Sequence, residues 1–284
     1  MVHKNRWYRI PLAILGYLVL IIVALTMVIP FIWMITTSLR PFGSTFSYPP
    51  ELIPKTFDTS NYTRLFTLVP FGRYFVNTIF ITAATVLGQL FICAMAAYGF
   101  SRLKFWGRDT IFVLYLATMM IPFQIILIPL YLMVFRLGWV NTYQGLIVPS
   151  LSSAFGIFLL RQAFFNIPQD YQDAARIDGA GEFRIFLQII LPLAIPSLAT
   201  LGVFAFMGAW TDLLWPVLIA RDQQMRTLEV GLAYFNAGTV GAFRQPNWPL
   251  MMAASVVVML PVLIVYFFTQ RFFVEGISMT GVKG

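Results

Sequence analysis

The densest group of ionisable side chains in this sequence lies in the segment DAARIDGAGEFRIFLQIILP, residues 173–192. The chain has only 19 basic and 11 acidic residues, yet this segment places five of them around two glycines: Asp173, Arg176, Asp178, Glu182 and Arg184. Carboxylates and guanidinium groups this close can pair with one another, as Asp173 and Arg176 can at i and i+3, or with charges on a partner protein. From the residues alone, a solvated loop and a docking surface are equally good interpretations.

The sequence lacks the usual side chains of a catalytic centre. His3 is the only histidine, and no GxSxG or HExxH motif occurs, so a hydrolase or metalloenzyme would lack its usual nucleophile or ligands. No GxxxxGK[ST] phosphate loop occurs either. We therefore expect no enzyme activity, no metal site and no cofactor in this chain.

The composition indicates a membrane protein, because 59% of the residues are hydrophobic and only 11% are charged. Crossing the hydrocarbon core takes about 20 apolar residues in a helix. Six uncharged runs are longer than that: residues 10–39, 74–101, 110–135, 137–160, 185–211 and 245–270. We predict an all-α polytopic membrane protein with about six transmembrane helices.

Other features of the composition exclude some alternatives. The net charge of +8 is spread over the loops, so it does not indicate nucleic-acid binding. The first apolar run is too long for a secretory signal and is expected to remain as a helix. Cys93 is the only cysteine and is expected to be a small buried residue without a disulfide.

The distribution of basic residues predicts the orientation. With six spans both termini lie on one side, and the short segments on that side carry more Lys and Arg residues than those on the other. The positive-inside rule then places both termini in the cytoplasm. Segment 40–73 lies outside, where its prolines favour an irregular excursion.

Small residues and prolines suggest how the spans pack. Ala84, Gly88, Ala94 and Ala97 in the second run would allow close helix approach, so we expect an interior helix. Prolines that can bend or break spans lie at positions 30, 122, 192, 196 and 216.

The charged segment itself predicts two helices joined by a glycine turn. Pro168 is suited to begin the first helix, and Gly179 and Gly181 can end it. One shallow face would carry Tyr171, Ala174, Ala175 and Asp178. A second helix, with Phe183, Phe186, Leu187 and Ile190 on one side, would run directly into the fifth span.

This segment resembles the EAA motif of permease subunits of bacterial ATP-binding cassette importers. The match comprises Asp173-Ala174-Ala175, Gly179 and Ile189-Ile190-Leu191-Pro192, with Asp173 in place of the usual glutamate. Stretches beginning at Asn77, Leu137 and Gly208, and the terminal GVKG, are similar to the carbohydrate branch of that family, which is MalG-like. The resemblance covers most of residues 67–284.

The resemblance implies a single permease domain over residues 1–284 of a bacterial inner-membrane importer. Its partners would be a second related permease, two ATPase subunits that bind ATP and Mg, and an extracytoplasmic solute-binding protein. The solute would be a sugar, oligosaccharide or polyol derivative, moved by alternating access. A coupling loop over residues 165–186 would contact an ATPase through Tyr171, Asp173, Ala174, Ala175, Asp178, Gly179 and Phe183.

Three further sites are expected. The C-terminal residues Gly281, Val282, Lys283 and Gly284 would reach the ATPase. An outer loop, residues 221–248, would contact the binding protein through Phe235, Asn236, Gly238, Gly241, Phe243 and Arg244. Asp212, between Trp210 and Trp215, either caps a helix break at the end of the fifth span or forms a polar solute site beside indole faces.

A secondary transporter or channel not driven by ATP is the alternative. Ion coupling would call for acidic residues in several spans, and this chain offers only Asp212.

Overall fold

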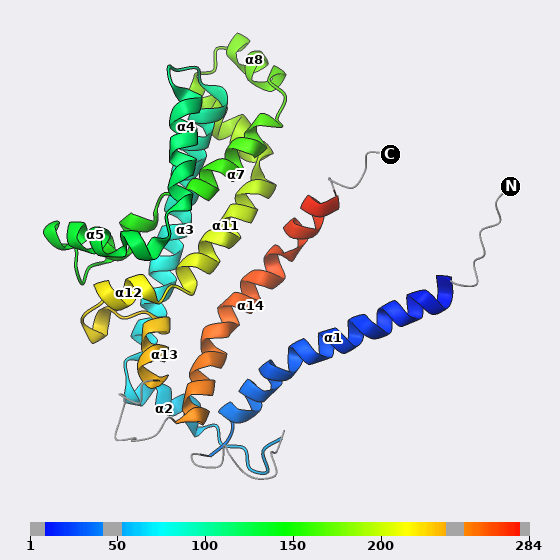
Figure 1. Cartoon of the computed structure of the whole chain (residues 1–284), viewed down its shortest axis with the longest axis vertical. Helices are drawn as coiled ribbons and strands as arrows, with labels where there is room; N and C mark the ends of the chain where they lie inside the picture. Colours follow the sequence, from blue (N-terminus) through cyan, green and yellow to red (C-terminus); the bar gives the residue numbers. More distant parts are fainter. Residues whose placement is uncertain (1–8, 42–52, 237–246, 279–284) are drawn as a thin grey trace. The chain divides into compact units, whose positions relative to one another are not determined.

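The computed structural model describes residues 9–41, 53–236 and 247–278, and no strand occurs in these ranges (Figure 1). This confirms the all-α prediction. The longer helices are α1 (Arg9–Ser38), α3 (Phe71–Arg102), α4 (Arg108–Ala117), α5 (Phe123–Arg136), α7 (Ala154–Phe165), α11 (Ile195–Trp210) and α14 (Trp248–Ser278). The shorter helices are α2 (Ser60–Leu68), α6 (Tyr143–Ile147), α8 (Asp170–Ile177), α9 (Glu182–Ile185), α10 (Leu191–Leu193), α12 (Leu214–Ile219) and α13 (Leu228–Asn236). Helical turns η2 (Thr118–Met120), η3 (Val148–Ser150), η4 (Phe186–Ile190) and η5 (Gln223–Met225) connect some of them.

The chain divides into two compact units. One comprises Met1–Val69 and Leu232–Met259, and the other comprises Pro70–Gly231 and Leu260–Gly284. In the first unit, the buried Asn61 amide donates to the carbonyls of Ser38 and Arg40 at 2.9 and 2.8 Å, which satisfies orphan acceptors at the end of α1. Asn61 belongs to α2, so the expectation that segment 40–73 is irregular is wrong for Ser60–Leu68.

Helices long and apolar enough to cross a membrane support the count of six spans. Within the described residues, three are single helices: Ala13–Ser38, Phe71–Arg102 and Trp248–Gln270. Three more candidates are bent pairs: Arg108–Met120 with Phe123–Arg136, Tyr143–Ser150 with Ala154–Phe165, and Glu182–Leu193 with Ile195–Trp210. The prediction of six is therefore met if each bent pair counts as one span.

Proline explains two of these three bends. Pro122 stands at the 103° break between η2 and α5, where the preceding Ile121 is extended, as the residue before proline prefers. Pro192 and Pro196 flank the 81° break at Ala194. The 45° break lies before Ser153, whose hydroxyl caps α7 by accepting from the Gly156 N–H at 3.1 Å. By contrast, Pro30 lies inside the single helix α1, so it does not break this span.

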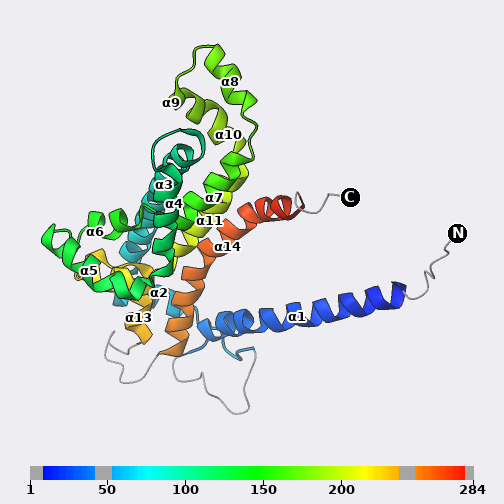
Figure 2. The same cartoon turned by 45° about the horizontal axis from the view of Figure 1, so that its top comes forward.

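The core of the second unit forms where α3 packs against α7 and α11, which run alongside one another in Figures 1 and 2. Cys93, Ala94 and Ala97 of α3 are buried there, as their small side chains predict. A Cβ atom added to Gly156 of α7 would lie 2.9 Å from a Leu201 methyl and 3.1 Å from the Cys93 sulfur. The three helices therefore meet where only glycine fits without rearrangement.

Substituting Gly156 with alanine should lower the midpoint of thermal unfolding in detergent, because overpacking this contact costs about 1–3 kcal/mol. Gly99→Ala in α3 is the matched control, since an added Cβ there meets no atom within 4 Å. That control should be neutral or slightly stabilising through its higher helix propensity. Equal midpoints for the two variants would contradict the proposed close contact.

Candidate functional site

The predicted coupling loop, residues 165–186, lies at one end of the second unit (Figure 2). Its first helix, α8, begins at Asp170 rather than at Pro168, because Gln169 is the N-cap, whose carbonyl accepts from the Asp173 N–H at 3.1 Å. The helix ends as the glycines predict. Gly179 has φ +81°, and its N–H donates to the Arg176 carbonyl at 3.0 Å, while the Ala180 N–H donates to the Ala175 carbonyl at 2.9 Å. This pair of bonds is a Schellman motif, in which a left-handed glycine terminates the helix.

The two faces of α8 differ in exposure. Gln172 and Ala175 are buried, whereas Tyr171, Asp173 and Ala174 are exposed. The prediction that Ala175 shares an exposed face with Tyr171 and Ala174 is therefore wrong, because Ala175 packs into the core around α3 and α7. The exposed surface of the loop also includes Asp178 and Phe183, and Ile177, which the sequence analysis did not select.

The second helix of the loop does not run straight into α11. It consists of α9, a π-helical stretch η4 and α10, and the 81° break at Ala194 separates it from α11. The Leu191 N–H bonds to the Phe186 carbonyl, five residues back, so the turn holds an extra residue and the helical face rotates. As a result Phe186 and Ile190 are buried while Phe183 and Leu187 are exposed, which corrects the predicted single side.

A chain of polar contacts fixes the loop to α3. The Tyr98 hydroxyl donates to a Glu182 carboxylate oxygen at 2.5 Å and accepts from the buried Gln172 amide at 3.3 Å. Arg176 bridges the two halves of the loop, with nitrogens 2.8 Å from Glu182 and 3.0 Å from Asp173. The hydrogen bond to Glu182 raises the pKa of Arg176, so this guanidinium stays charged. Asp173 therefore has a partner within the chain and is still exposed enough to meet another.

Arg102, at the end of α3, fixes the start of the loop. Its guanidinium donates to the backbone carbonyls of Phe164 and Ile167, the latter at 2.5 Å. Phe164 lies in the last turn of α7, where carbonyls have no partner within the helix, and Ile167 lies two residues beyond its end. The start of the loop is therefore bound to α3 through its own main-chain carbonyls.

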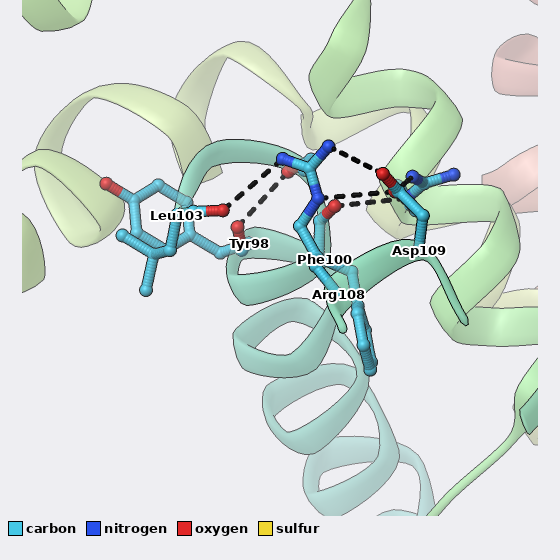
Figure 3. A network of polar contacts seen from close by, with 7 residues as sticks. Tyr98, Phe100, Leu103, Arg108 and Asp109 are labelled. Atoms are coloured by element: carbon cyan, nitrogen blue, oxygen red, sulfur yellow. Dashed lines mark hydrogen bonds and ion pairs between the residues drawn. The ribbon is translucent and has the colours of Figure 1, made fainter. Parts of the chain in front are cut away.

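A second network joins α3, α4 and α7 at this end (Figure 3). Arg161 donates to the Phe100 carbonyl at 3.1 Å and contacts Asp109 at 2.8 Å. Arg108 contacts Asp109 at 3.2 Å and donates to the Leu103 carbonyl at 3.3 Å. Asp109 therefore links two arginines, one bound to a carbonyl in the last turn of α3 and the other to the carbonyl of its C-cap, which gives the loop a rigid base.

The anchoring residues Tyr98, Arg102 and Arg161 were not predicted from the sequence. They contact groups that lie 52 to 84 residues away in sequence, and no local pattern reports such pairs. One sequence signal could have indicated contacts between these segments: Glu182 and Arg102 are charged residues in loops predicted to lie on the same side of the membrane.

Asp212 caps a helix and also lines a cavity. Its Oδ1 accepts from the Trp215 N–H at 3.3 Å, as the interpretation of a capped break predicted. The side chain is among those that line a cavity of the second unit. Both indoles are buried elsewhere: Trp215 donates to the Gly145 carbonyl at 2.9 Å, and Trp210 stacks on Phe206. Neither lines this cavity, so the expected site beside indole faces is not formed there.

The remaining candidate residues are only partly described. Phe235 lies in α13 and is buried, so it is not an exposed aromatic anchor, and Asn236 is the last residue of that helix. Four residues of the outer loop and four of the tail lie outside the described residues: Gly238, Gly241, Phe243, Arg244, Gly281, Val282, Lys283 and Gly284.

Tyr98→Phe should loosen the loop without displacing any hydrophobic contact. It removes a hydroxyl that bonds both Glu182 and the buried Gln172, at a cost of about 1–2 kcal/mol. Amides of residues 170–186 should then exchange with deuterium roughly tenfold faster in the intact protein. Tyr115→Phe, which removes a bond to Ser152 away from the loop, is the control and should leave these amides unchanged. Slow exchange in both variants would show that the network does not hold the loop.

Comparison with known proteins identifies relatives along most of the chain. Residues 89–279 match the family described as binding-protein-dependent transport system inner membrane component. The arabinooligosaccharide transport permease AraQ of Halalkalibacterium halodurans is 34% identical over 265 residues, 92% of this chain and 93% of the relative. The sn-glycerol-3-phosphate transport permease UgpE of Rhizobium meliloti is 31% identical over 278 residues, 94% and 96% of the two chains.

A solved structure agrees with these relatives. A chain of a bacterial ABC transporter involved in the import of the acidic polysaccharide alginate superposes with a TM-score of 0.82 at 27% identity, and covers 96% of this chain and 100% of that one. These relatives are permeases of ATP-binding cassette importers, so the alternative prediction of a secondary transporter or channel is wrong. With its bent apolar helices and its anchored loop, the chain belongs to the family of inner-membrane permease components of binding-protein-dependent ABC importers.

Proposed function

We propose that this chain transmits ATP-driven motion to the membrane helices through the loop formed by α8 and α9. The observation that supports this most strongly is the contrast between the two sides of the loop. One side is fixed to α3 through Tyr98 and Arg102, while the other exposes apolar side chains, among them Ile177 at 87% exposure. Such an anchored apolar surface with flanking carboxylates is suited to a groove on a separate ATPase subunit.

The proposed assembly contains a second related permease, two ATPase subunits that bind ATP and Mg, and an extracytoplasmic solute-binding protein. The family description supports the binding protein, since transport by its members depends on one. In this assembly both termini face the cytoplasm, the tail residues 281–284 reach the ATPase, and the outer loop meets the binding protein through its segment 236–247.

The proposed solute is a carbohydrate. The names of the relatives support this class, because they include transporters of arabinooligosaccharides and of the polysaccharide alginate. Glycerol 3-phosphate, a polyol derivative, is carried by another relative. The chain itself would supply no chemistry and would reorient between outward and inward access.

Gly179→Val tests whether the turn of the loop matters for transport. A β-branched side chain is strained at φ +81°, so ATP-dependent uptake should fall at least tenfold while membrane insertion persists. Gly181→Val is the matched control, because Gly181 has φ −74°, which valine adopts readily, and open space around its Cβ position. Normal uptake by the Gly179 variant would count against the coupling role.

Ile177→Glu tests the docking surface itself. Placing a charge at the centre of an apolar contact should weaken ATPase binding by tenfold or more. The measurement is the amount of ATPase subunit that copurifies with the membrane complex. Ile53→Glu, at a residue 71% exposed in the segment predicted to lie outside, is the control and should retain the ATPase. Retention in both variants would exclude this surface as the contact.

A further inference from the structure

The second unit contains a cavity of about 500 Å³, which is within the range of about 300–1,000 Å³ typical of small-molecule sites. The middle of α3, the start of α7 and the second half of α11 contribute to its walls, together with residues around η3 and α12. The lining combines hydroxyl groups, one amide and one carboxylate with aromatic rings. Among these residues are Thr85, Gln89, Ser152, Ser153, Asp212 and Thr227.

Two of the hydroxyl groups have no hydrogen-bond partner among the residues that the structure describes. Thr85 and Thr227 are 3% and 4% exposed, and neither Oγ1 bonds to another group in the described part of the chain. Burying a hydroxyl without a hydrogen-bond partner is unfavourable, so such groups usually meet a ligand or water. Because both residues line the cavity, a molecule there could satisfy them.

The other polar groups of the lining are held in place. Gln89 donates to the Ser150 carbonyl at 2.9 Å, the Ser152 hydroxyl bonds to Tyr115 at 2.5 Å, and Asp212 accepts from the Trp215 N–H. Phe155 and Phe204 form an edge-to-face pair with ring centroids 5.3 Å apart in the same lining. Oriented donors and acceptors beside apolar ring faces match a polyhydroxylated molecule, which has both hydroxyl groups and C–H faces.

The charge of the lining side chains further limits which class of molecule the cavity can bind. Asp212 is the only charged side chain among the described residues that line the cavity, and none of them is Lys, Arg or His. A phosphate or uronate would have to leave water and face a carboxylate without a counter-charge, which is strongly unfavourable in a membrane protein interior. A neutral solute meets no such cost.

We propose that this cavity binds the transported solute during its passage, and that it selects neutral polyhydroxylated molecules over anionic ones. The proposal rests on the proposed function, because it assumes that the importer carries carbohydrates. It separates this chain from two relatives, which serve sn-glycerol 3-phosphate and an acidic polysaccharide, and groups it with the transporter of arabinooligosaccharides.

The first test is uptake into proteoliposomes that contain the complete importer and its loaded binding protein. The neutral probes are arabinotriose and diacetylchitobiose, and the anionic probes are an alginate trisaccharide and glycerol 3-phosphate. ATP-dependent uptake of a neutral probe only is the expected result. Uptake of an anionic probe would overturn the charge selection while the proposed function stands, whereas absence of ATP-dependent uptake of every probe would overturn the proposed function and this inference with it.

The second test uses Thr85→Val, which removes one unpartnered hydroxyl at nearly constant volume. With the transported probe at saturating binding protein, the ATP hydrolysed per solute moved should rise about fivefold, as expected for one lost hydrogen bond of about 1 kcal/mol. Thr82→Val is the matched control, because Thr82 lies one turn away on α3 with the same 3% exposure and an unpartnered hydroxyl, but does not line the cavity. An unchanged ratio in the Thr85 variant, or an equal rise in both, would overturn the assignment of the cavity as a solute site.

Discussion

The close packing of α3 against α7 and α11 is the contact on which the other features of the second unit depend. In a lipid bilayer no hydrophobic driving force acts between helices, so their association depends on close van der Waals packing and hydrogen bonds. Here the fit comes from Gly156, whose missing side chain leaves room for the Cys93 sulfur and the Leu201 methyl groups, and from the small buried Ala97. All three helices supply walls of the cavity, and α3 and α7 also contribute, with α4, to the base of the coupling loop.

Helix α3 connects these two levels. Thr85 and Gln89 contribute to the cavity, and Tyr98 and Arg102 hold the loop. At about 1.5 Å per residue, Thr85 and Tyr98 are separated by about 20 Å along the helix. The helix is unbroken over that length, since it runs from Phe71 to Arg102. Under the proposed function, a displacement of the loop would reach the cavity wall through this one unbroken helix, whereas an 81° break separates the second helix of the loop from α11.

The sequence predicted the features that depend on composition and local turns. Uncharged runs identified the candidate spans, and Gly179 identified the left-handed end of α8. It did not predict that Ala175 is buried, because helical spacing alone does not say which side of α8 faces the core. It also could not predict η4, since a π turn follows from tertiary packing and shifts every later side chain around the axis. Contacts such as Tyr98 with Glu182 join residues distant in sequence, and only the packed helices bring them together.

The charged residues of segment 173–184 fall into two groups, those paired within the protein and those exposed without an ion-pair partner among the described residues. Arg176 and Glu182 are used internally, because their contact closes the glycine turn and Glu182 also binds Tyr98. Asp178 and Arg184 have no ion-pair partner among the described residues, Arg184 donates only to Gln188 at 2.9 Å, and both side chains are exposed. Asp173 lies between these groups, since it contacts Arg176 yet remains half exposed. The carboxylate of Asp173 reaches Arg176, one turn away, so the internal contacts and the exposed charges of the loop overlap at this residue.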